Sequence, residues 1–187
     1  MTLEQKKEEC LALLRSTNRP KIEDLINHIT KMGYFKAPGS LKHHRFEGGL
    51  LSHSLETYHK AVELREQKIR NGYSPESMPI ESVIIAALLH DLCKADQLRY
   101  NHDENKVCVI KKSYEHSKRS VSLIGYSGFV LSQDEKDAIL WHMGGKRQCR
   151  DEQKRQDFFQ SHPLCDIIHR ADGISIGESK RRHHRKR

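Results

Sequence analysis

The sequence has no paired cysteine motif and no long hydrophobic run, and each absence excludes a class of protein. Its five cysteines are odd in number and scattered, without a Cys-x-x-Cys pair, which argues against a disulfide framework or a zinc knuckle. No apolar run approaches the roughly 20 residues of a membrane-spanning helix, and residues 1–9 do not resemble a signal peptide. We therefore expect a cytoplasmic protein with reduced thiols and no membrane association.

The chain also contains no Pro/Gly/Ser-rich linker and no internal repeat, so its 187 residues predict one domain with a substantial core. The formal net charge is +8, but the last eight residues carry six basic side chains, and without them the charge falls to +2. The folded body is thus only mildly basic, and the overall charge says little about a partner. We predict N-terminal helices within residues 1–36, a main domain over 37–176 and a disordered basic tail over 177–187.

Hydrophobic periodicity indicates an all-α fold, a helical bundle with a short β-hairpin near residues 99–112. The helix at 80–95 is apolar nearly all round and should be central, while the helix at 50–70 has apolar residues on two sides. Ser132 and Glu135 form a capping box, which predicts a helix start. The remaining helices are expected at 3–15, 20–32, 115–125 and 163–173, and the capped helix should run through Trp141.

Polar side chains interrupt the apolar faces of these helices. The pair His90-Asp91 ends the most apolar helix, where an unpaired charge would cost several kcal/mol. Helical spacing places further histidines and one aspartate on inward faces of other helices. The candidate inward set is His53, His90, Asp91, His116, His142 and Asp172.

Such a set is typical of a transition-metal site. Neutral imidazoles suit first-row metals and a carboxylate can bridge two cations, so this ligand set favours Mn, Fe, Ni or Zn over magnesium or calcium. Six ligands are enough for two metals. A two-metal site can stabilise both the attacking and the leaving oxygen of a displacement at phosphorus. We therefore expect a divalent transition metal as cofactor, with two ions per chain if His116 and His142 both ligate and one if neither does.

The ordered residues His53, His90-Asp91 and Asp172 resemble the HD superfamily of metal-dependent phosphohydrolases, whose signature is H…HD…D on an all-α bundle. The resemblance covers residues 43–175. His116 and His142 resemble the additional ligands of the dinuclear members, as in the HD-GYP proteins. The run from His43 to His53 is similar to the HD domains of bacterial 3′-to-5′ exoribonucleases and of some conjugation-related proteins, although the RNA-binding module of those exoribonucleases has no counterpart here.

The resemblance implies roles for residues near the motif. Asp91 would bridge the metals and act in catalysis, and Lys94 resembles the lysine of the HD-x-x-K variant, which lies near the substrate phosphate. Alternatively, Lys94 is an ordinary basic residue in a last helical turn. Four more basic residues either contact substrate phosphates or form a solvated face. These four are Arg119, Lys146, Arg147 and Arg150.

The other histidines carry no assigned ligand role. His43 and His44 precede a Gly-Gly turn and are expected either at the mouth of the site or exposed in a loop. Surface or boundary positions are expected for the histidines at 28, 59, 102, 162 and 169.

Three function classes follow. The first is a phosphohydrolase acting on a phosphomonoester or phosphodiester, with a phosphorylated small molecule or a nucleic acid as substrate. The second is a di-iron oxygenase, because the HD-fold oxygenases such as myo-inositol oxygenase have a similar ligand set. The third is a non-catalytic nucleic-acid-binding or regulatory module, which the mildly basic body and the tail without aromatic residues make least favoured. The sequence specifies neither the substrate nor the oligomeric state.

Overall fold

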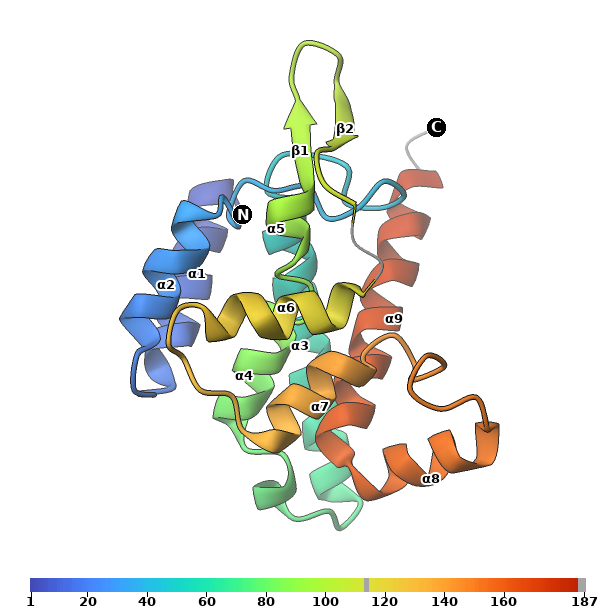
Figure 1. Ribbon diagram of the computed structural model, residues 1–187. Coiled ribbons are helices and arrows are strands. Elements are labelled where there is room, and N and C mark those ends of the chain that lie inside the picture. Colours follow the sequence, from blue (N-terminus) through green and yellow to red (C-terminus); the bar gives the residue numbers. More distant parts are fainter. Residues whose placement is uncertain (113–114, 185–187) are drawn as a thin grey trace.

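The computed structural model describes residues 1–112 and 115–184, which form a helical bundle with one small hairpin (Figure 1). The predicted all-α class is confirmed. A single 3-10 turn, Pro75–Ser77, precedes the central helix. The helices are α1 (Leu3–Ser16), α2 (Ile22–Lys31), α3 (Gly49–Arg70), α4 (Ile80–Leu89), α5 (Lys94–Gln97), α6 (His116–Gly125), α7 (Gln133–Trp141), α8 (Glu152–Ser161) and α9 (Pro163–His184).

Helix starts follow local capping chemistry. Thr2 and Gln5 form a capping box at α1, and Ser132 and Glu135 form the predicted one at α7, so exposed backbone N–H groups of both first turns are bonded. Glu135 is also fully buried and accepts hydrogen bonds from Ser82 at 2.9 Å and Arg19 at 2.7 Å. One carboxylate therefore joins the start of α7 to α4 and to the segment before α2.

The core lies around α4, whose residues 82–89 are all buried, as its apolar sequence predicted. Helix α3 packs against α4 and α9, and α7 packs against α4 and α9 from another side. Removing a fully buried side chain such as Ile85 would cost about 2–5 kcal/mol. Helices α1 and α2 contribute to the same hydrophobic core, and a domain boundary after residue 36 stays a prediction.

Helix α4 ends at Leu89, six residues before the predicted end. The chain then turns through His90–Cys93 before the single turn of α5. A side chain distant in the sequence contributes to the end of α4, because the buried Tyr34 hydroxyl donates a hydrogen bond to the Leu88 carbonyl at 2.6 Å. That bond satisfies a carbonyl that a continuing helix would have used, so the turn can carry His90 and Asp91.

The predicted hairpin is present. Strands β1 (Leu98–Asn101) and β2 (Lys106–Val109) pair antiparallel, with Leu98 opposite Val109. The hairpin projects from the end of the bundle just after α5 (Figure 1). It is held at its base, where the Gln97 carbonyl accepts from the Ile110 N–H at 2.8 Å.

The C-terminal prediction was wrong in one respect: α9 does not end near Gly173 but runs to His184. A glycine inside a helix costs about 1 kcal/mol. The packing of α9 on α3, which buries Ile168, Ser175 and Ser179, favours continuation of α9 past Gly173. Residues 177–184 of the expected disordered tail are thus helical, and 185–187 lie outside the described residues.

Helix α8, whose described residues include none that is fully buried, was not predicted.

All five cysteines are free. Burial raises the pKa of the Cys10 thiol and of the Cys93 thiol to about 12, while Cys108 and Cys149 are partly exposed. Each helix in the described part of the chain is too short or too polar to cross a membrane.

Candidate metal centre

Five of the six predicted ligands meet in the middle of the bundle. His53 lies on α3, His90 and Asp91 lie in the turn after α4, His142 directly follows α7, and Asp172 lies on α9. All five are buried, with the least buried, Asp172, only 6% exposed. Residues separated by more than a hundred positions in the chain are therefore brought into one cluster by helix packing.

The ligand atoms face one another. The His53 Nε2 atom lies 3.1 Å from Asp172 Oδ1, 3.2 Å from His90 Nε2 and 3.6 Å from Asp91 Oδ2. On the other side of the same carboxylate, Asp91 Oδ1 lies 3.7 Å from His142 Nε2. The two oxygens of Asp91 are thus directed at two different parts of the cluster, as a bridging carboxylate requires.

Backbone carbonyls fix the orientation of two rings. His90 Nδ1–H donates to the Ala87 carbonyl at 2.9 Å, and His142 Nδ1–H donates to the Ile139 carbonyl at 2.6 Å. Both rings use free carbonyls of the last helical turn just before them, where such groups lack helical partners. This tautomer leaves a lone pair on Nε2, the atom that faces the cluster.

Two buried polar atoms of the cluster, His142 Nε2 and Asp172 Oδ1, have no hydrogen-bond partner among the described residues. Buried polar atoms without partners are uncommon in folded proteins. Converging lone pairs and carboxylate oxygens would repel one another, whereas a cation between them would satisfy all of them. The described residues therefore fit a metal ion with nitrogen and oxygen ligands.

Electrostatics keep the two carboxylates and His142 in the states that bind metals. Burial raises the pKa of Asp91, but the Lys94 ammonium in direct contact with it, together with His90 and His53, outweighs burial and holds that pKa well below its usual range. Burial also opposes ionisation of Asp172, yet close contact with the His53 ring, together with the neighbouring His90 and His142 rings, brings its pKa to about 2. Burial lowers the pKa of His142 to about 4, so its ring is neutral near pH 7.

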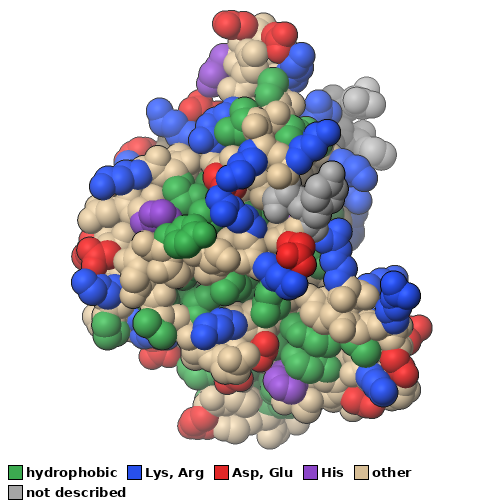
Figure 2. All heavy atoms as spheres, in the orientation of Figure 1, with side chains coloured by type: hydrophobic (Ala, Val, Ile, Leu, Met, Phe, Trp, Pro, Cys, Tyr) green, Lys and Arg blue, Asp and Glu red, His purple; other side chains and the backbone are tan. Residues whose placement is uncertain are grey.

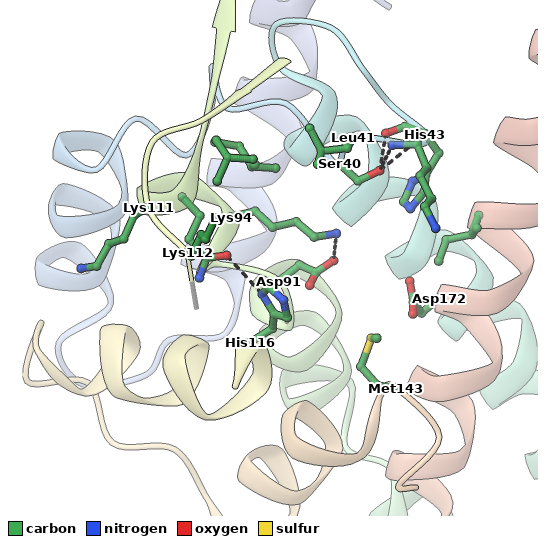
Figure 3. A pocket seen from close by; sticks show the side chains of 15 residues that line it. Ser40, Leu41, His43, Asp91, Lys94, Lys111, Lys112, His116, Met143 and Asp172 are labelled. Atoms are coloured by element: carbon green, nitrogen blue, oxygen red, sulfur yellow. Dashed lines mark hydrogen bonds and ion pairs between the residues drawn. The ribbon is translucent and has the colours of Figure 1, made fainter. Parts of the chain in front are cut away.

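A cavity of about 540 Å³ opens onto the cluster. Asp91, Lys94 and Asp172 form part of its lining, and Figure 3 shows Lys94 reaching across to Asp91. The walls combine apolar side chains of the hairpin, α9 and two loops with three lysines besides Lys94. The apolar residues are Leu41, Leu98, Val109, Met143 and Ile176, and the lysines are Lys42, Lys111 and Lys112. On the face seen in Figure 2, basic side chains alternate with exposed apolar ones.

The sixth predicted ligand, His116, lies at the edge of this cavity and outside the ligand groups found among the described residues. Its Nδ1 atom is 3.1 Å from Gln97 Oε1 and 3.9 Å from Cys93 Sγ. The ring is partly exposed at the start of α6. Its role as a metal ligand stays a prediction.

The predicted phosphate-binding residues are spread over different places. Arg119 pairs with Asp96 at 2.5 Å on α5. Lys146 and Arg147 line a smaller cavity of about 160 Å³, which shares His116 and Met143 with the larger one. Arg150 is exposed beyond them. Their contacts with substrate stay predictions.

His43 and His44 are buried beside His53, so the alternative of exposed loop residues was wrong, and His43 lines the cavity at the site. Their loop lies so close to α3 that a Cβ atom on Gly49 would be 2.0 Å from the His44 carbonyl oxygen. Glycine at 49 is therefore required for this approach. The His-His pair ahead of Gly-Gly was the only sign of it in the sequence. Burial lowers the pKa of His43 to about 3.

Other histidines without a predicted ligand role lie outside the cluster. His59 and His102 are exposed and pair with Glu9 and Glu47. His169 contacts the site only indirectly, because its Nδ1 atom lies 2.7 Å from the His142 carbonyl.

Comparison with protein families gives one match. The HD domain family model matches residues 50–177, a span that runs from the start of α3 through most of α9 and includes all five clustered residues. Searches of curated proteins and of solved structures returned no match.

Proposed function

Because this chain belongs to the HD domain family, we propose that it is a metal-dependent phosphohydrolase acting on a phosphomonoester or phosphodiester. The observation that carries the proposal is the convergence of three histidine Nε2 atoms and two carboxylates, both of which line a cavity that also contains a lysine ammonium. A metal cation and an ammonium group both suit phosphoryl chemistry, because each can neutralise charge on the phosphoryl oxygens.

We propose that His53, His90, Asp91 and Asp172 hold one cation and that Asp91 and His142 hold a second. The opposed oxygens of Asp91, one toward His53 and one toward His142, support this dinuclear arrangement. His116 would complete the second site if its ring turned away from Gln97. The ligand types favour Mn, Fe, Ni or Zn.

A bound divalent cation would supply an activated water and charge neutralisation at phosphorus. The side chains of the cavity would bind and orient the substrate. Lys94, held in place by Asp91, would contact a phosphoryl oxygen of the substrate. The apolar wall formed by Leu98 and Val109 would cover the organic part of the ester, which suits a nucleotide or the end of a nucleic acid. Lys146 and Arg147 in the adjoining cavity would take a further phosphate.

The proposal is tested by metal analysis of the purified protein together with a panel of phosphomonoesters and phosphodiesters. We expect bound transition metal, phosphate or alcohol release with at least one ester, and loss of both metal and turnover in Asp91→Asn. Asp103→Asn, an exposed aspartate in the hairpin turn, serves as the matched control. Iron-dependent oxygen uptake without ester hydrolysis would instead identify an oxygenase, and metal-free protein with unchanged Asp91→Asn would refute the metal site.

A further inference from the structure

A serine and a glutamate form a hydrogen-bond chain to the Nδ1 atom of His53, on the side of the ring away from the cluster. The His53 Nδ1 atom lies 3.1 Å from Ser175 Oγ, and the Ser175 hydroxyl donates to Glu56 Oε2 at 3.2 Å. Since the only hydroxyl hydrogen of Ser175 is used toward Glu56, its oxygen must accept from His53 Nδ1–H. When it is neutral, His53 consequently presents a lone pair on Nε2, the atom that faces Asp172 and His90.

The same carboxylate oxygen supports a second histidine chain. His44 Nε2 lies 3.1 Å from Glu56 Oε2, and a carboxylate oxygen can only accept, so His44 donates. The other nitrogen of His44 lies 3.1 Å from His43 Nδ1 and is left to accept from it. His43 then keeps a lone pair on Nε2, and its ring points into the cavity (Figure 3).

We propose that Glu56 is a positioning residue that sets the tautomers of two histidines at once, His53 at the cation and His43 at the cavity wall. Ser175 carries the first link and His44 the second. Glu56 lies on α3, one turn after His53, so a single helix holds both the ligand and the carboxylate that orients it. Such outer partners of ligating histidines commonly change metal affinity by 10–100-fold.

The inference rests on the proposed function only in assuming that the cluster binds a cation, and its test needs no turnover. Metal-free protein is titrated with Mn²⁺ and the free ion is followed by its paramagnetic resonance signal. We expect Glu56→Ala and Ser175→Ala each to weaken binding by about tenfold or more. The double variant should lose no more than Glu56→Ala alone, because both act through one chain of hydrogen bonds.

Three controls separate this effect from general damage. Glu63→Gln, an exposed position on the same helix, should bind Mn²⁺ as the unmodified protein does. His44→Asn, which suits the left-handed backbone at φ +50°, cuts only the second chain, so its Mn²⁺ affinity should fall less than that of Ser175→Ala. Circular dichroism of each metal-free variant checks that the fold is intact.

The ring tautomers are read directly from ¹⁵N spectra of the Zn²⁺-loaded protein. We expect His53 and His43 to carry hydrogen on Nδ1, and His43 alone to change in His44→Asn. Unchanged Mn²⁺ affinity in both Glu56→Ala and Ser175→Ala would overturn the proposal, as would His53 carrying its hydrogen on Nε2. If no ester is hydrolysed but Mn²⁺ affinity falls as expected, the positioning role stands and the phosphohydrolase assignment fails.

Discussion

Removing the cation should lower the thermal stability of this protein by a large and measurable amount. The proposed ligands come from α3, the turn after α4, the end of α7 and α9, so a bound ion would join four parts of the chain that meet only in the folded state. Because the unfolded chain cannot assemble this set, nearly all of the binding free energy adds to folding.

The size of the effect follows from mass action. At a free cation concentration about 1,000 times the dissociation constant, binding adds about 4 kcal/mol to the free energy of unfolding. For a chain of 187 residues, each kcal/mol shifts the melting temperature by about 2–4 °C. We therefore expect the midpoint to fall by about 8–16 °C when a chelator removes the metal.

The assay is differential scanning calorimetry of the protein with excess Mn²⁺ and with chelator. Asp172→Asn keeps the size of the side chain but replaces a ligand oxygen pair by an amide, so most of the metal-dependent shift should disappear. His102→Ala, on the exposed hairpin, should keep the full shift. An equal midpoint with and without metal, or a full shift in Asp172→Asn, would refute the reasoning.

Three further predictions address substrate binding, stability and burial. Lys94→Met should lower kcat/KM by about tenfold or more with the metal content retained, because the ammonium next to Asp91 is expected at the substrate phosphate; steady-state kinetics with metal analysis measures this. Arg19→Ala should lower the free energy of unfolding by about 2 kcal/mol in urea titrations, since it leaves the buried Glu135 carboxylate without its cation. In native protein, Cys108 and Cys149 should react with a thiol reagent much faster than the three buried cysteines; equal rates for all five would contradict the packing.

Several features of the fold followed directly from local sequence. The capping box at Ser132, the two-sided apolar pattern of α3 and the nearly uniform apolar character of α4 all act through neighbouring residues. Inward placement of His53 and Asp172 also follows from helical spacing alone. These signals depend on contacts within a few residues, which is why a single sequence reveals them.

Other features depend on contacts that are remote in the chain. The end of α4 was placed too late because Leu92 and Ala95 continue its apolar pattern, whereas the Tyr34 hydroxyl bond to Leu88 comes from another segment. The burial of His44 depends on the close approach of its loop to Gly49, which has no periodic signature. Local patterns cannot report such long-range contacts, so these residues were found only in three dimensions.

The net charge of the cluster would influence which substrate anion binds when the site holds a cation. In a loaded site, where His53 must be neutral to bind the cation, Asp91 and Asp172 are ionised, Lys94 is protonated and His142 is neutral, so these side chains carry a small net negative charge. One divalent ion would turn that into a small positive excess, matched by the single charge of a phosphodiester. A second ion would raise it further and match the dianion of a phosphomonoester better. The occupancy of the centre would thereby select between the two ester types on electroneutrality alone.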